Sequence, residues 1–212
     1  MHHLSSADFA DCTDFNEDLP ENMKPSEIDL NKFPVFNLWK EAGRVIDVKV
    51  EGNSMLPLMR PGDTVSLRLT DGFVLKIGDL IAFWQNGNLI VHRFIRRRKL
   101  DKSVWLCQKG DNLSGWSWIP ADEVVGRVET IRSRGKQIDM NTRLWTWINR
   151  VMGSLVFFWI SAVDKARLSK ESVAPGLQLP VLRGVVSRMG RVLNNTYGLI
   201  AMRALRAKGK ES

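Results

Sequence analysis

The sequence predicts a mainly β fold: a bent antiparallel domain followed by a helical, basic C-terminal extension. Between residues 38 and 134, apolar and polar residues alternate with a period of two and β-branched residues are frequent, which is typical of strands. From about residue 141, apolar residues recur at helical spacing instead. We therefore expect an acidic flexible arm over 1–37, a β domain over 38–134 and an amphipathic helical extension over 141–212.

The N-terminal arm is polar and acidic. Residues 1–32 hold eight acidic and two basic side chains, and Asn22, Pro25 and Ser26 interrupt regular structure. No signal peptide is expected, because the first thirty residues lack an apolar core segment. These features predict a cytoplasmic protein, or one held peripherally at a membrane surface.

Six stretches of the central region are expected to be strands. The third and fourth flank Gln85-Asn86-Gly87-Asn88, which predicts a tight hairpin because Asn-Gly accepts the positive φ angles of such a turn. The short loops favour antiparallel pairing. The stretches are Ile46–Val50, Val65–Leu69, Leu80–Trp84, Leu89–Phe94, Val104–Gln108 and Val124–Ile131.

Two helices are expected in the extension, separated by Pro175-Gly176 and Pro180. Residues 164–212 hold ten basic and three acidic side chains, which gives either a solvated face or attraction to anionic lipid or nucleic acid. The apolar positions are Leu144, Trp145, Ile148, Val151, Met152, Leu155 and Phe158 in the first helix, and Leu182, Val185, Val186, Met189, Val192 and Leu193 in the second.

The first helix could pack on the β domain, lie on a membrane or cross one. Its run Val151–Val163 is short of the roughly 20 apolar residues that a span needs. Extending the run to Leu144 includes Asn149 and Arg150, and a charge near the centre of a span costs about 2.5–3.5 kcal/mol. Packing on the domain is favoured, an interfacial helix is the second interpretation, and spanning is disfavoured.

Few residues can carry metal or redox chemistry. Cys12 and Cys107 form no disulfide framework, and His2 and His3 lie at the N-terminus, which leaves His92 as the histidine inside the fold. We expect no metal and no cofactor.

The most informative segment is Gly52-Asn53-Ser54-Met55-Leu56-Pro57, followed by Pro61-Gly62-Asp63. Glycine and proline restrict the backbone conformation around Ser54, and a serine nucleophile has to be held rigidly in this way. A serine in such a turn is, however, more often a simple turn residue. A nucleophile also needs a base. His92 is the candidate, on the apolar face of its strand with Ile90 and Phe94, while Arg93 faces the other way.

A third polar segment, Lys109-Gly110-Asp111-Asn112, follows a predicted strand directly. Asp111 could accept the second ring N–H of His92 and fix its tautomer. An Asx-turn aspartate is an equally good interpretation of the same residue.

In this order, the segments resemble the signal peptidase I family, which is related to the self-cleaving LexA-like domains of SOS repressors. Gly78-Asp79-Leu80-Ile81-Ala82-Phe83 is similar to the family's Gly-Asp-hydrophobic strand. Ile119-Pro120 and Val124-Val125-Gly126-Arg127-Val128 are similar to its closing motifs. The resemblance covers about residues 38–130.

Three departures from the family pattern are visible. His92 stands where bacterial members and repressors have a lysine base, as in the Ser/His branch of the endoplasmic reticulum and archaea. The further aspartate of that branch is replaced by Ser117, and a side-chain oxyanion donor of related proteases is replaced by Gly52. In place of an N-terminal membrane helix, this chain has the polar arm.

The resemblance implies a serine endopeptidase that cleaves a peptide or protein precursor, with Ser54 as nucleophile, His92 as base and Asp111 orienting His92. Met55 and Pro57 are expected to contact the substrate, which is implied to carry small residues before the cut. Alternatives are a catalytically silent peptide-binding module and a membrane-surface accessory protein acting through 141–212. A nucleic-acid-binding regulator is disfavoured, because the arm is acidic and no helix-turn-helix precedes the β domain.

Overall fold

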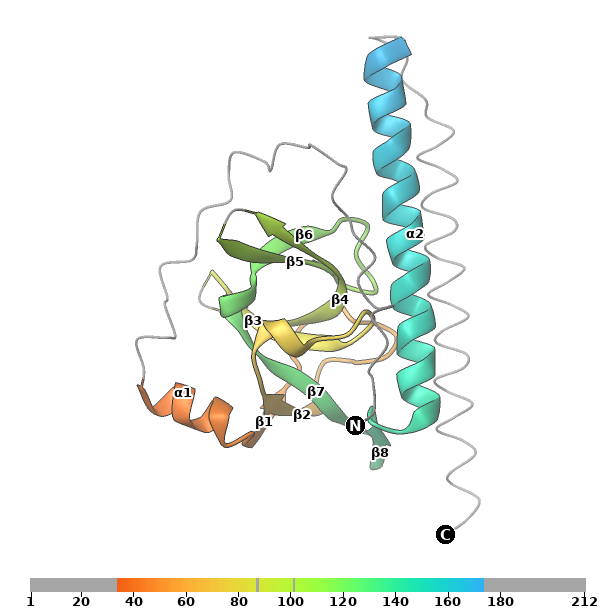
Figure 1. The fold of residues 1–212 in the computed structure, drawn as a ribbon. Coiled ribbons are helices and arrows are strands. Elements are labelled where there is room, and N and C mark those ends of the chain that lie inside the picture. The colour runs from red at the N-terminus through yellow and green to blue at the C-terminus, as the bar shows by residue number, and fades with distance from the viewer. Residues whose placement is uncertain (1–33, 87, 101, 174–212) are drawn as a thin grey trace, which may run out of the picture.

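The computed structural model describes residues 34–86, 88–100 and 102–173. Its β domain is one curled antiparallel sheet in the strand order β1-β2-β7-β3-β4-β5-β6, with β8 paired to β7 (Figure 1). The predicted fold class is confirmed. The strands are β1 (Val45–Lys49), β2 (Thr64–Leu69), β3 (Leu80–Gln85), β4 (Asn88–Leu100), β5 (Ser103–Lys109), β6 (Ser117–Pro120), β7 (Val124–Ser133) and β8 (Lys136–Asp139).

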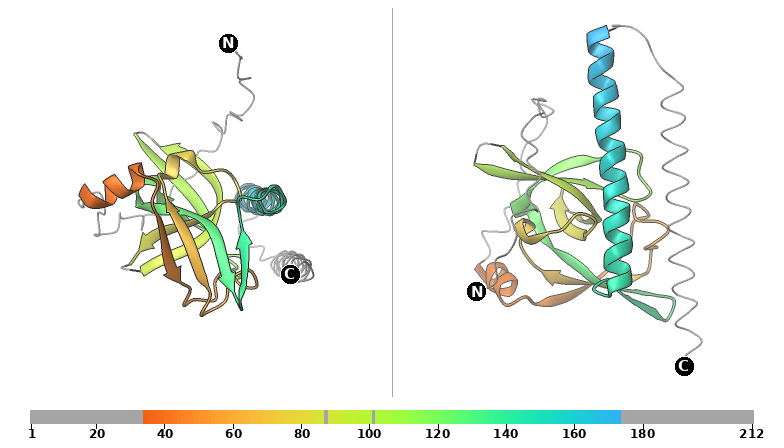
Figure 2. Two further views of the ribbon diagram at one scale, coloured as in Figure 1. Left: turned by 90° about the horizontal axis from the view of Figure 1, so that it is seen from below. Right: turned by 45° about the vertical axis from the view of Figure 1, so that its right-hand side comes forward.

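Register shifts account for the bend of the sheet. They fall between Ser66 and Leu67 in β2, between Ala82 and Phe83 in β3, and between Phe94 and Arg96 in β4. An extra residue on one strand of an antiparallel pair bends that strand and increases its twist. The sheet therefore curls around its own core, as the two views in Figure 2 show.

The central strand β3 is buried on both faces. Leu80 and Ala82 belong to one apolar cluster, and Ile81 and Phe83 belong to a second cluster on the opposite face. A strand covered on both sides has a continuous apolar sequence, which explains the run from Leu80 to Phe83. The two-residue hairpin is confirmed, because Gln85 pairs with Asn88 and Asn86 has a φ of 51°.

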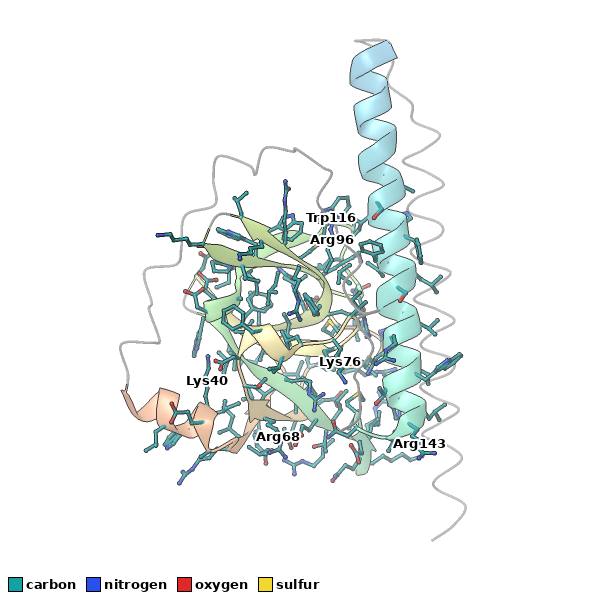
Figure 3. The ribbon with its side chains drawn as sticks, viewed as in Figure 1. Lys40, Arg68, Lys76, Arg96, Trp116 and Arg143 are labelled. Carbon is teal, nitrogen blue, oxygen red and sulfur yellow. The ribbon has the colours of Figure 1, made fainter. Side chains whose placement is uncertain are left out.

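Short helices close two edges of the domain. Helix α1 (Pro34–Glu41) begins within the predicted flexible arm, so residues 34–37 are helical. The rest of the arm, residues 1–33, lies outside the described residues. The Lys40 ammonium donates to the carbonyl of Val124 at 2.7 Å and holds α1 against the domain (Figure 3). The 3-10 helices η2 (Gly72–Val74) and η3 (Ala121–Glu123) cap the same region.

The long helix α2 (Arg143–Val173) packs beside β4, and its C-terminal part projects beyond the sheet (Figures 1 and 2). A side-chain carbon at Gly153 would lie 2.6 Å from the Cα of Gly78, so only glycines permit this close approach. Ile148 and Ile160 are buried on the same side. The expected second helix, over 182–193, lies outside the described residues.

The opposite side of α2 is apolar and exposed. Leu144, Trp147 and Phe158 expose 55%, 63% and 68% of their surface. The stretch Arg143–Val163 is long and apolar enough to cross a membrane by length and composition, with 28% of its apolar window buried against the domain. The core helices of soluble proteins can be equally long and apolar, and one side of α2 is packed on the domain.

Candidate active site

Ser54 lies in a loop between β1 and β2 that is closed by hydrogen bonds at its base. Val50 and Asp63 join the two ends through a 2.8 Å bond from the Val50 N–H to the Asp63 carbonyl. The Asp63 carboxylate accepts the Arg60 N–H at 2.8 Å and fixes the final turn. The Pro-Gly-Asp segment therefore closes the loop that carries the half-buried Ser54.

A second loop, at the end of β5, holds the backbone of Ser54 in place. The Asn112 N–H donates to the Ser54 carbonyl at 2.7 Å, and the Asn112 side chain donates to the Asn53 carbonyl at 3.2 Å. A side chain at Gly110 would meet the Ser54 carbonyl oxygen at 2.9 Å. The glycine thus allows the Ser54 loop to lie directly against the end of β5.

His92 is brought to the same place by the β4–β5 pairing. Arg93 pairs with Lys109 at the end of the β4–β5 register, and the His92 ring contacts Gln108, the residue before Lys109. The Ser54 carbonyl is bound by the same segment of chain a few residues later, at Asn112. Ser54 and His92 are therefore both held by residues 108–112, although no hydrogen bond joins them within the described part of the chain.

The face predicted for His92 is the one that the structure shows. Its ring makes an edge-on contact with Phe83, with ring centroids 5.8 Å apart, and His92 exposes 7% of its surface. Burial is the main cause that lowers the pKa of His92, and the Lys109 charge lowers it further. The Gln108 contact and the Asp111 charge act in the raising direction but do not cancel the effect of burial. The imidazole is therefore neutral at neutral pH, the form that a base requires.

Gln108, rather than Asp111, contacts the His92 ring. Gln108 is 2% exposed, and its Oε1 faces the His92 Nδ1 in a short hydrogen bond. Its Nε2 donates to the Ser117 hydroxyl at 2.5 Å. With Oε1 as the acceptor, Nδ1 carries the proton and Nε2 of the neutral imidazole keeps its lone pair.

The prediction that Asp111 contacts His92 is wrong. Both carboxylate oxygens of Asp111 accept from Arg93, Oδ1 from Nε at 2.9 Å and Oδ2 from Nη2 at 2.7 Å. Arg93 points away from His92 on the other face of β4, and a guanidinium offers a carboxylate a two-pronged bond that an imidazole cannot offer. Asp111 acts on His92 through its charge, not through a hydrogen bond.

The Arg93–Asp111 pair fastens the loop beside Ser54 to the rest of the domain. Arg93 is fully buried, and its Nη1 donates to the Gly78 carbonyl and to the Asn149 Oδ1, each at 2.9 Å. One side chain thus connects β4, the loop after β5, the turn before β3 and α2. Neither Arg93 nor Asn149 was assigned a role from the sequence.

Of the two predicted substrate contacts, Met55 is part of the core. It is 3% exposed within the first apolar cluster, and its sulfur accepts the Asp111 N–H at 3.5 Å. A buried thioether cannot line an open cleft, so this prediction is corrected. Pro57 is half-buried beside Ser54 in sequence, and its contact with substrate stays a prediction.

A backbone donor is available for an oxyanion. The Ser54 N–H donates no hydrogen bond to any of the described residues, so it is free to bind a substrate oxygen.

The Lys109 side chain stabilises the turn after β5. Its ammonium donates to the carbonyls of Gly110 and Leu113, at 3.0 and 2.5 Å. Burial is the main cause that lowers the pKa of Lys109.

Residues 18–112 match the family described as Peptidase S24-like. This match, together with the curled antiparallel sheet, supports a fold of the serine-peptidase type. The resemblance to the signal peptidase I and LexA-like group is thereby confirmed. The match ends after Asp111 and Asn112, so β6, β7, β8 and α2 lie beyond it. A comparison with curated proteins found no match.

Proposed function

We propose that the protein is a serine endopeptidase in which Ser54 is the nucleophile and His92 the general base. The observation that carries the proposal is that Ser54 and His92, 38 residues apart in sequence, are both held by residues 108–112. Serine needs a base to act as a nucleophile near neutral pH. A buried neutral imidazole next to the serine loop meets that need.

In the proposed reaction, Ser54 Oγ attacks the scissile carbonyl carbon while His92 Nε2 takes the hydroxyl proton. The same nitrogen then returns the proton to the leaving amine, and water hydrolyses the acyl-enzyme with His92 again as base. Gln108 holds the Nδ1–H tautomer, so that Nε2 is the free nitrogen. A neutral amide orients the ring but stabilises the imidazolium less than a carboxylate does.

The oxyanion would be held by the Ser54 N–H. Position 52 is glycine, which supplies no side-chain donor there. Loss of one oxyanion donor costs about 10²–10³ in rate in other proteases. The missing oxyanion donor at position 52 and the Gln108 amide, which takes the place of a carboxylate beside His92, both favour a slow enzyme. A slow rate is sufficient for an enzyme that processes one precursor.

The proposed substrate is an extended segment of a peptide or protein precursor. The family resemblance implies small residues before the cut, and a strand-like substrate can pair with an exposed sheet edge. Such binding uses main-chain hydrogen bonds for affinity and small pockets for selectivity.

The test is cleavage of a peptide library by the full-length protein, with products identified by mass spectrometry. Parent protein should cut after small residues, and Ser54→Ala and His92→Ala should not cut at all above background. Ser103→Ala, an exposed serine at the start of β5, is the matched control and should behave as the parent. Equal cleavage by the parent and Ser54→Ala would refute the proposal.

A catalytically silent peptide-binding module is the second candidate. It is favoured by the absence of a Ser54–His92 hydrogen bond among the described residues. This candidate predicts that parent and Ser54→Ala bind the same peptides with equal affinity while neither cleaves them.

A further inference from the structure

A polar cavity of about 240 Å³ lies between α2 and the β domain, and neither Ser54 nor His92 is among its lining residues. Its lining includes the apolar residues Leu80, Val128 and Met140 and the side-chain amides of Asn141 and Asn149. A water molecule occupies about 30 Å³ of liquid. The cavity is therefore large enough for a small polyatomic anion.

Three cationic side chains from three different elements converge on this cavity. Lys76 comes from the turn before β3, Arg127 from β7 and Arg150 from α2. Figure 3 shows Lys76 at the junction of the β domain and α2. All three line the cavity together with Asp79, the one carboxylate of the lining, and the charge of each lowers the pKa of Asp79.

Asp79 does not neutralise this cluster. Its Oδ2 accepts the Lys76 N–H at 2.8 Å and so closes the turn before β3. Burial raises the pKa of Asp79, and this effect outweighs the Lys76 N–H and the three cations, which lower it. One carboxylate against three cations leaves the cavity with an excess of positive charge.

The cations have little other compensation. Among the described residues, neither Lys76 nor Arg150 makes an ion pair or a side-chain hydrogen bond. Arg127 donates to Asn141 Oδ1 at 3.0 Å and lies 3.8 Å from Glu129. Glu129 is bound more closely by Arg68, at 2.6 Å. Guanidinium groups suit phosphate oxygens because they donate two parallel hydrogen bonds.

The position of the cavity favours an anion as well. Asn141 and Thr146 of its lining flank the start of α2, where the helix dipole is positive. The two glycines Gly78 and Gly153 hold α2 in close contact with the turn that carries Lys76. Packing of α2 on this turn therefore fixes the backbone positions that carry Lys76 and Arg150.

We propose that this cavity binds a phosphate group, held by Lys76, Arg127 and Arg150. The phosphate belongs either to a soluble ligand or to an anionic lipid headgroup. The exposed apolar side of α2, with Trp147 and Phe158, makes the lipid source a concrete alternative. Both sources offer the same chemistry to the cavity, and experiment separates them.

The first arm of the test titrates inorganic phosphate into the full-length protein by calorimetry in low-salt buffer. The double variant Lys76→Gln/Arg150→Gln should bind at least about tenfold more weakly, the factor expected for lost charge-assisted hydrogen bonds. Asn141→Asp adds a carboxylate beside Arg127 and should also weaken binding. The control Lys99→Gln/Lys102→Gln removes two exposed charges elsewhere and should match the parent.

The second arm is flotation with phosphatidylcholine vesicles, with and without phosphatidylglycerol. Phosphate binding that both cavity variants weaken supports the site with a soluble source. Flotation that requires phosphatidylglycerol and falls in the cavity variants but not in the control supports it with a lipid source. If the parent binds neither probe, or if the cavity variants bind as the control does in both arms, the proposal is overturned.

Discussion

Replacing Asp111 with alanine should destabilise the protein strongly, because Asp111 neutralises a fully buried guanidinium. The two side chains expose 0% and 5% of their surface and share two charge-assisted hydrogen bonds. Removing one partner of a buried pair costs about 3–5 kcal/mol, since the other charge is left without compensation. The loop that bonds the Ser54 carbonyl through Asn112 should loosen as well.

Urea unfolding followed by tryptophan fluorescence measures this loss. Asp71→Ala is the matched control: Asp71 pairs with Lys40 at 3.6 Å but its side chain is 65% exposed, so about 0–1 kcal/mol is expected. Exposed pairs contribute at most about 1 kcal/mol. If the free energies of unfolding of Asp111→Ala and Asp71→Ala differ by no more than about that amount, the buried-pair argument is refuted.

Two further predictions concern the base and the docking of α2. The pH profile of kcat/KM should rise with a midpoint below the ordinary histidine value of about 6.5, because burial lowers the pKa of His92 and the base acts when neutral. Gln108→Glu should raise that midpoint by about 1–3 pH units, since an adjacent carboxylate favours the imidazolium form of His92. An unchanged midpoint would contradict the contact between Gln108 and the His92 ring. Gly153→Leu should lower stability by about 1–3 kcal/mol through collision with Gly78, measured by thermal unfolding. Ala162→Leu on the exposed side is its control, and equal stability of the two would contradict the docking seen at Gly78.

The central strands could be predicted because their pattern is local. Period-two alternation identified six strands, and Asn86 identified the β3–β4 hairpin. Strand β8 was not predicted. The turn between β7 and β8 consists of Arg134 and Gly135, with φ of 50° and 72°, and arginine is not a residue that indicates a turn. Strand β6 was missed because it is short and ends at Pro120, as edge strands do.

The site was only partly predictable for a different reason. Alternation placed His92 on the inner face correctly, because that depends on neighbours in the same strand. The choice between Gln108 and Asp111 as its partner depends on which side chain the pairing of β4 with β5 brings beside the His92 ring, and on Arg93 binding the Asp111 carboxylate. Gln108 could have been suspected, since it is a polar residue within an apolar strand, two positions before Gly110.

The most direct test of the central claim is site-mapped acylation of Ser54. Full-length parent, Ser54→Ala and His92→Ala would be incubated with an active-site-directed fluorophosphonate, and the modified residue identified by mass spectrometry. Ser54 should be labelled in the parent, nothing should be labelled at that loop in Ser54→Ala, and His92→Ala should react about 10²–10⁴-fold more slowly. Labelling of all three proteins at the same rate, or at a residue other than Ser54, would contradict a serine nucleophile activated by His92.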